Sequence, residues 1–178
     1  MNARISFWIA AWALLSTGAR AQVIDEYRVK AAFIYNFAKF VEWPPQVFKT
    51  AKDPITVCVL GQNPFGNALE EAVRGKTVEG RAFIVRQLPG EQAATGCQIL
   101  FVSSSERNRL HSILSDIKTT GVLTVGDTET FASEGGVINF RIDAGAVRLQ
   151  VNVDAADQAK LRISSKLLSL AQIVKSKQ

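Results

Sequence analysis

The hydrophobic pattern of the chain begins with a helical period and then changes to that of strands. Apolar and aromatic residues recur at helical spacing from Val29 to Val41, and Pro44 and Pro45 stop the helix. The β-branched run "ITVCVLG" at residues 55–61 ends at a glycine, as buried strands commonly do. The pattern predicts an amphipathic helix that packs on a sheet; a partly exposed partner surface is the alternative use of its aromatic face.

Helical and strand-like segments alternate through the middle of the chain. A helix is expected over residues 63–75, with Asn63 as N-cap and Pro64 at its first position. Strands are expected at 82–88, 97–103 and 122–127. Between the last two strands, Ser104 or Ser105 caps a helix predicted over 106–121, and "TETFASEGG" at 128–136 is interpreted as a short capped helix.

The last third of the chain has a different pattern. Residues 137–153 read as two alternating strands joined by "DAG" at 143–145, which is typical of a hairpin. Asp154 is expected to cap one final helix that continues to Val174. The whole order predicts an α/β fold: a single three-layer domain with a largely parallel sheet, an antiparallel C-terminal hairpin and flanking helices.

The first 21 residues have the composition of a secretory signal peptide. A basic residue, Arg4, precedes an apolar run, and Ala19-Arg20-Ala21 fits a small-residue cleavage site. The alternative is a buried N-terminal helix. Cleavage would leave residues 22–178 as one domain outside the cytoplasm, and loss of Arg4 and Arg20 would lower the formal charge from +5 to +3. So mild a charge does not indicate nucleic-acid binding.

Cys58 and Cys97 are the two cysteines of the chain. An even count in an exported protein favours a disulfide between them. Two buried free thiols are the alternative.

Few residues suggest catalysis. His111 is the single histidine and falls within a predicted helix, while Glu70 and Glu71 point in different directions on another. The sequence contains no metal-binding spacing, no phosphate-binding glycine loop and no nucleophile elbow. We therefore expect no enzyme activity, no metal and no cofactor.

Polar residues at the carboxyl ends of the predicted strands suggest a ligand site instead. Small molecules bind in that crevice of open α/β sheets. The candidates are Asn63, Ser103, Ser104 and Asp127. Capping of the following helices explains the same residues equally well.

Several stretches together resemble the YfiR family of exported bacterial proteins. They are "VKAAFIYNFAKFVEWP" (29–44), "ITVCVLG" (55–61), "CQILFVSSSE" (97–106), "GGVINF" (135–140) and "ISSKLLSLA" (163–171). The resemblance extends from about Tyr27 to Val174, and its motifs are specific in combination rather than singly.

The resemblance implies a periplasmic repressor that binds the periplasmic part of an inner-membrane diguanylate cyclase. Such a protein lowers cyclic di-GMP and biofilm formation, and an outer-membrane lipoprotein can sequester it. The alternative function is a periplasmic small-ligand sensor that reports to another membrane receptor. The family's first cysteine pair corresponds to Cys58 and Cys97, whereas its second pair is missing from this chain.

Two surfaces are predicted to contact the partner. The first carries the aromatic residues Tyr35, Phe40 and Trp43 at the end of the first helix. The second is the end of the hairpin, where Arg148 and Gln150 share one face of a strand and Asn152 follows them. The family resemblance also allows a homodimer.

Overall fold

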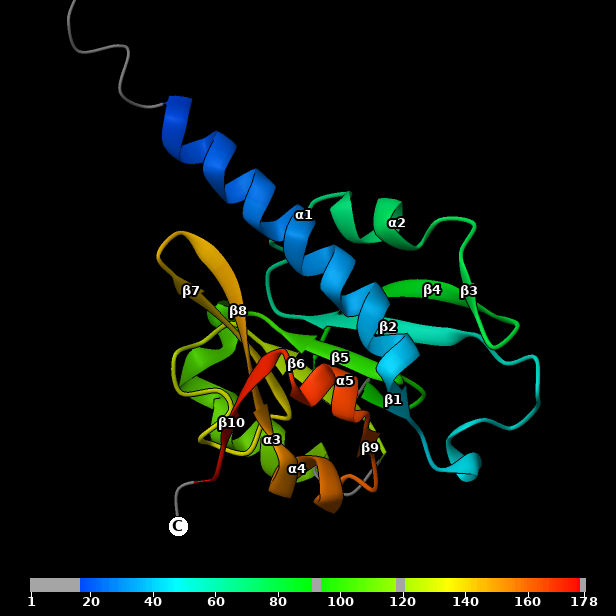
Figure 1. Cartoon of the computed structure of the whole chain (residues 1–178). Helices are drawn as coiled ribbons and strands as arrows, with labels where there is room; N and C mark the ends of the chain where they lie inside the picture. The colour runs from blue at the N-terminus through cyan, green and yellow to red at the C-terminus, as the bar shows by residue number, and fades with distance from the viewer. Residues whose placement is uncertain (1–16, 91–93, 118–120, 177–178) are drawn as a thin grey trace, which may run out of the picture.

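The computed structural model describes residues 17–90, 94–117 and 121–176 (Figure 1). In the first helix, side chains are described from Glu26 onward. The elements in chain order are α1 (Thr17–Phe40), β1 (Val41–Glu42), η1 (Pro45–Val47), β2 (Ile55–Leu60), α2 (Ala68–Val73), β3 (Thr77–Val78), β4 (Arg81–Leu88), β5 (Ile99–Val102), η3 (Ser104–Arg109), α3 (Leu110–Ile117), β6 (Leu123–Gly126), β7 (Ile138–Asp143), β8 (Ala146–Asn152), α4 (Val153–Gln158), β9 (Arg162–Ile163), α5 (Ser165–Leu168) and β10 (Ala171–Val174). Most of the predicted signal peptide lies outside the described residues, so its cleavage stays a prediction.

Eight strands form the main sheet, in the order β10-β8-β7-β6-β5-β2-β4-β3. The central strands β4, β2, β5, β6 and β7 run parallel to one another, whereas β7 and β8 form an antiparallel hairpin and the short β3 pairs with β4 in the antiparallel direction. Strand β10 joins β8 in parallel and forms one edge, and β1 and β9 make a separate antiparallel pair. The predicted α/β fold, with its largely parallel sheet and C-terminal hairpin, is confirmed.

The buried side chains divide into two clusters, one on each face of the sheet. Strand β2 shows the division, because Val57 and Val59 belong to the cluster under α1 while Cys58 and Leu60 belong to the cluster under α3. Alternation along a strand sends successive side chains to opposite faces. Figure 1 shows α1 crossing one face of the sheet and α3 lying behind it, so the domain has three layers.

Helix α1 packs on the sheet through its aromatic residues. Phe37 is fully buried and stacks on Phe140 of β7, with ring centroids 5.7 Å apart. The ring of Phe33, which is half-buried, has its centroid 6.1 Å from that of the same Phe140 ring. The predicted packing of this helix on the sheet is confirmed, and its aromatic composition follows mainly from this core.

The hairpin loop is one residue shorter than the predicted "DAG" turn. Asp143 still pairs with Ala146, so the loop consists of Ala144 and Gly145 alone. Both have positive φ, 48° and 76°, which is the requirement of the two-residue turn that matches the strand twist.

The prediction of one final helix from Asp154 to Val174 is wrong. Asn152, rather than Asp154, caps α4, because its Oδ1 accepts the backbone N–H of Ala155. The helix ends at Gln158, and Lys160 adopts a left-handed φ of 59°. The remaining residues form β9, α5 and β10, since pairing with β1 and β8 satisfies their backbone groups in place of a helix.

Two shorter helices also differ from the prediction. The helix expected from Pro64 begins four residues later, at Ala68, because Asn63 Oδ1 accepts the N–H of Phe65 and Gly66 turns the chain with φ 55°. The segment 128–136 forms successive hydrogen-bonded turns rather than a helix. Its buried Phe131 packs against two glycines, Gly126 before the segment and Gly136 at its end.

Substitution Gly126→Ala is expected to destabilise the protein by about 1–3 kcal/mol, because an added methyl group would overlap the Phe131 ring. Urea unfolding measures this loss. Gly90→Ala is the matched control, since a methyl group there meets nothing within 4 Å. Equal stability of Gly126→Ala and Gly90→Ala would contradict the packing argument.

Candidate functional site

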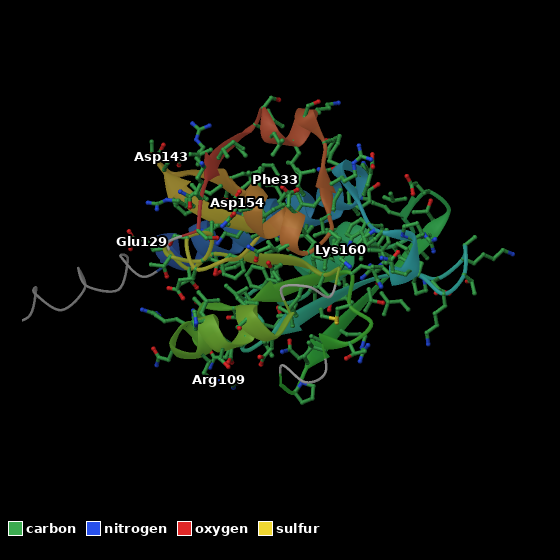
Figure 2. The ribbon with its side chains drawn as sticks, turned by 90° about the horizontal axis from the view of Figure 1, so that it is seen from below. Phe33, Arg109, Glu129, Asp143, Asp154 and Lys160 are labelled. Carbon is green, nitrogen blue, oxygen red and sulfur yellow. A yellow bond between two sulfur atoms is a disulfide. The ribbon has the colours of Figure 1, made fainter. Side chains whose placement is uncertain are left out.

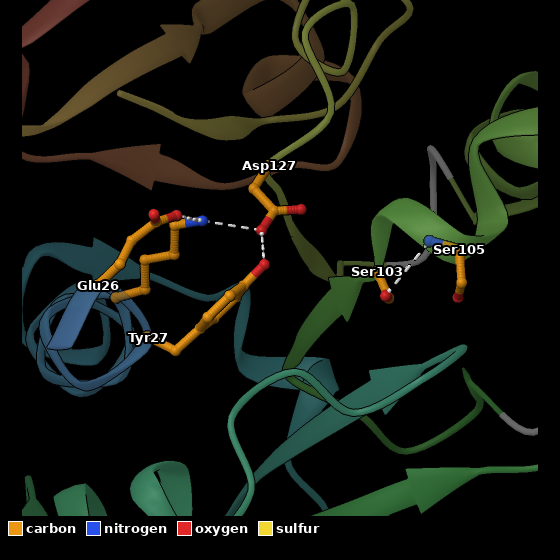
Figure 3. Close-up of polar contacts among 6 residues, drawn as sticks. Glu26, Tyr27, Ser103, Ser105 and Asp127 are labelled. Atoms are coloured by element: carbon orange, nitrogen blue, oxygen red, sulfur yellow. Dashed lines mark hydrogen bonds and ion pairs between the residues drawn. The ribbon is translucent and has the colours of Figure 1, made fainter. Parts of the chain in front are cut away.

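An ion-paired cluster lies at the carboxyl end of β6, where α1 passes the sheet (Figure 3). The Lys30 ammonium group, 3% exposed, contacts the carboxylates of Asp127 and Glu26. Lys30 Nζ and Tyr27 Oη each donate a hydrogen bond to Asp127 Oδ2, both at 2.8 Å. Tyr27 and Lys30 of α1 thus contact Asp127, the residue that follows β6, and Glu26 joins the cluster through Lys30.

The surroundings of this cluster keep the Tyr27 hydroxyl protonated. Burial, followed by the negative charge of Asp127, raises the pKa of Tyr27 above its ordinary value. The phenol therefore remains a hydrogen-bond donor to the carboxylate. Lys30 also lies 4.3 Å from the centre of the Tyr27 ring, which adds a cation–π contact.

A hollow of about 300 Å³ opens beside the cluster. Its lining includes two of the predicted ligand residues, Ser104 and Asp127, together with Tyr27, Phe140 and Arg141. The other oxygen of the Asp127 carboxylate, Oδ1, points away from Tyr27 and Lys30 and has no hydrogen-bond partner among the described residues (Figure 3).

The remaining predicted ligand residues have local structural roles. Asn63 lies in an exposed turn, where its amide also donates to Gly66 O. Ser103 is the N-cap of η3, with its Oγ accepting from the Ser105 N–H at 3.4 Å, so the cap falls one residue before the expected Ser104 or Ser105. Neither Asn63 nor Ser103 lines the hollow.

Glu26, Tyr27 and Lys30 were not among the residues predicted from the sequence for this site. The residue spacing offered one indication, because Glu26 and Lys30 stand four apart on a helix, as paired charges often do. Lys30 itself is a second indication, because a lysine on the apolar face of a helix indicates a carboxylate on the element packed against that face.

The aromatic residues of the first predicted partner surface are half-buried and have partners within the chain. Trp43 Nε1 donates to Gln98 O at 3.2 Å, and Tyr35 packs edge-on against Phe83. Phe40 lies under the Lys166 ammonium group at 5.4 Å.

The second predicted surface is more open. Arg148 is exposed and Gln150 is half-buried on β8. Asn152, in contrast, is completely buried, since its side chain caps α4 and donates to Ala132 O. In this structure Asn152 therefore supports the end of β8 rather than offering a side chain to a partner.

The disulfide expected from the sequence is present. Cys58 of β2 and Cys97, two residues before β5, are bonded with their Cα atoms 5.9 Å apart. Both are buried in the cluster under α3. The bond joins two parallel neighbours of the central sheet.

The described residues contain no group of three or more His, Cys, Asp or Glu side chains placed to hold a metal ion. His111 is exposed on α3. Within the same ranges, none of the helices is both long enough and apolar enough to cross a membrane.

These features define a class: a three-layer α/β module with an ion-paired cluster at its strand ends and an open polar hairpin. A family model for YfiR/HmsC-like proteins matches residues 27–172, and the chain belongs to this family. The family points to a periplasmic regulator of diguanylate cyclase signalling rather than to an enzyme.

Solved structures with similar folds have very different sequences. A conserved domain protein from Vibrio cholerae O1 biovar El Tor is 10% identical with a TM-score of 0.60, and the match covers 84% of this chain and 60% of that one. The ABC domain in complex with L-Trp from Streptococcus pneumonia is 11% identical with a TM-score of 0.51, and the match covers 86% and 60%. This chain thus spans about three fifths of each, and the likeness concerns the fold alone. None of the curated proteins compared with the chain matches it.

Proposed function

We propose that this protein is a periplasmic inhibitor of an inner-membrane diguanylate cyclase. In this proposal it binds the periplasmic part of the cyclase and keeps the enzyme inactive, which lowers cyclic di-GMP and biofilm formation. An outer-membrane lipoprotein that sequesters the inhibitor would release the cyclase. The protein acts by contact and catalyses no reaction.

The family match over residues 27–172 is the observation that carries this proposal. The predicted signal peptide at residues 1–21 supports the same compartment, because an exported chain meets the periplasmic side of membrane receptors. The Cys58–Cys97 bond agrees with an oxidising compartment.

The hairpin is the better supported of the two predicted contact surfaces. Exposed Arg148 and half-buried Gln150 are available there. The indole N–H of Trp43 is already used within the chain, and Tyr35 and Phe40 contact other side chains of the fold. A side chain that anchors an interface must be exposed before the partner binds. We therefore assign the cyclase contact to the hairpin.

Deletion of the gene in its own host is expected to raise cellular cyclic di-GMP, and an intact copy is expected to restore the original level. A copy carrying Arg148→Glu should restore it much less, because reversing a charge within a contact surface disturbs its electrostatic complementarity. Extraction and quantification of cyclic di-GMP test both statements. Arg86→Glu changes an exposed arginine of β4, far from the hairpin in the strand order, and is the matched control; it should restore the level fully.

An unchanged cyclic di-GMP level after deletion would refute the cyclase assignment. Full restoration by a folded Arg148→Glu protein would instead refute the hairpin as contact surface while leaving the inhibitor function intact. Immunoblots of the periplasmic fraction show whether the variants are present in equal amounts.

The hollow beside Asp127 favours a second candidate function, a small-ligand sensor that reports to a membrane receptor. Its volume of about 300 Å³ is at the lower limit for small-molecule pockets. A panel of periplasmic metabolites should then include one that raises the melting temperature of the wild-type protein but not of Ser104→Ala. If no compound in the panel raises it, this candidate function is withdrawn.

A further inference from the structure

The hairpin and the edge strand form a polar surface on the face of the sheet away from α1. On β7 and β8, Phe140, Leu149 and Val151 belong to the cluster under α1, so the intervening residues project to the opposite face. The strand register between β7 and β8 aligns Asn139 with Gln150 and Arg141 with Arg148. The register between β8 and β10 aligns Gln150 with Gln172.

A hollow of about 510 Å³ lies over these strands. It is lined by Arg141, Arg148, Gln150 and Gln172, together with Ile142, Asp143, Leu149 and Leu170. We call it the hairpin hollow. Figure 2 shows Asp143 at the outer end of the hairpin, away from the centre of the molecule.

Hydrogen bonds within the sheet leave mainly donors in the hairpin hollow. Asn139 Nδ2 donates to Gln150 Oε1, and Gln150 Nε2 donates to Gln172 Oε1, both at 3.2 Å. In this chain of amides both glutamine oxygens accept a hydrogen bond, and the chain ends at the amide N–H groups of exposed Gln172. At its other end, Asn139 Oδ1 is buried outside the hollow and has no partner among the described residues. Arginine side chains carry donors alone. Asp143, at the tip, is the one carboxylate in the lining.

The two arginines of the hairpin hollow also repel each other. Arg141 and Arg148 are directly opposite in the register, both are exposed, and neither has a carboxylate within ion-pair distance among the described residues. Like charges at opposed positions destabilise an antiparallel pair. A bound carboxylate would remove this repulsion and could accept hydrogen bonds from either guanidinium group.

Exposed apolar side chains and a sheet edge surround the hairpin hollow. Ile142 and Leu170 line the hollow and are 48% and 67% exposed, and Ile173 of the neighbouring strand β10 is 47% exposed. They are three of the five large apolar residues that the described part of the chain exposes. Strand β10 is the edge of the sheet, so its outer backbone groups can pair with another chain. These features suit a polypeptide better than a small anion.

From these contacts we infer that the hairpin hollow docks an extended, carboxylate-bearing segment of a partner protein, placed over β7 and β8 beside the edge strand β10. The carboxylates pair with Arg141 and Arg148, the Gln172 amide donates to the segment, and apolar residues of the segment cover Leu170. This inference rests on the proposed function, because it specifies the chemistry of the cyclase segment that the inhibitor would contact.

Binding of a fluorescent octapeptide of alternating Glu and Val tests the inference, since such a peptide is extended and acidic. Fluorescence anisotropy with the purified protein should show salt-sensitive binding below about 1 mM. Arg148→Glu and Arg141→Glu should each weaken binding at least about tenfold, whereas Arg86→Glu should not. A Lys–Val octapeptide should bind the double variant Arg141→Glu, Arg148→Glu better than it binds wild type.

Several outcomes would overturn the inference. These are no binding of the Glu–Val peptide up to about 1 mM, equal binding of a Gln–Val peptide, or unchanged binding to a folded Arg148→Glu variant. Phosphatidylglycerol vesicles provide a further arm: binding to vesicles that depends on both arginines, with no peptide binding, would identify a membrane surface instead. Since these measurements use no cyclase, their failure is distinct from an unchanged cyclic di-GMP level in the deletion strain.

Discussion

Substitution Lys30→Met is expected to lower the free energy of unfolding by about 3–5 kcal/mol, because it leaves the buried Asp127 carboxylate without its cation. The side chains of Lys30 and Asp127 are 3% and 6% exposed, so solvent stabilises an unpaired Asp127 carboxylate only weakly. Tyr27 would remain as a single neutral donor to Asp127 Oδ2. Urea unfolding followed by circular dichroism measures the loss.

A control from the same helix separates this effect from helix propensity. Lys39 is exposed and lies 4.2 Å above the Tyr35 ring, so Lys39→Met should cost less than about 1 kcal/mol. The double variant Lys30→Met, Asp127→Asn should be more stable than Lys30→Met alone, because both charges are gone. Equal losses for Lys30→Met and Lys39→Met would show that the buried ion pair does not stabilise the fold.

Replacement of both Cys58 and Cys97 by alanine is expected to destabilise the protein by about 4 kcal/mol, given that the bond closes a loop with a sequence separation of 39. The crosslink limits the conformations of the unfolded chain, and its removal restores them. Dithiothreitol should produce a comparable loss in wild type and none in the double variant. In the host, the reduced protein should repress the cyclase less because less of it is folded.

A reduced protein as stable and as active as the oxidised one would contradict this prediction. The measurement also tests what the absence of the family's second cysteine pair means for this protein. Because this chain has a single disulfide, its stability is expected to depend on Cys58–Cys97 more than the stability of a relative with two disulfides depends on either bond.

The two predictions concern different layers of the fold. The ion pair joins α1 to the carboxyl end of β6 on one side of the sheet, and the disulfide belongs to the cluster under α3 on the other. Their losses should therefore add when the variants are combined, because distant sites without shared partners are usually independent.

Sequence periodicity alone predicted most of the elements. The buried strands β2, β5 and β6 and the four apolar residues of α3 followed from spacing that the structure confirms. The helix predicted from Val29 to Val41 is also present, but it begins earlier, at Thr17, and ends at Phe40, because Val41 pairs with Ile163 in β1. Such patterns are local, and they report which side of an element faces the core. The disulfide was also predictable, since two cysteines in an exported chain leave one pairing.

The predictions from sequence were wrong where pairing or packing with distant residues determines the backbone conformation of a segment. Residues 154–174 carry leucines at nearly helical spacing and no glycine or proline, yet pairing with β1 and β8 converts parts of them into β9 and β10. The predicted helix at 128–136 was lost for a related reason, because burial of Phe131 against Gly126 and Gly136 determines the path of that segment.

The sequence by itself determined the α/β class, the helix that covers the sheet and the residues available for a disulfide, because these depend on period and composition. Only the tertiary structure decided which polar residues meet. Lys30 and Asp127 are 97 positions apart, and Gln150 and Gln172 are 22 apart. Strand order and register bring each pair together, and no local pattern encodes either one, since both arise when the whole sheet is assembled.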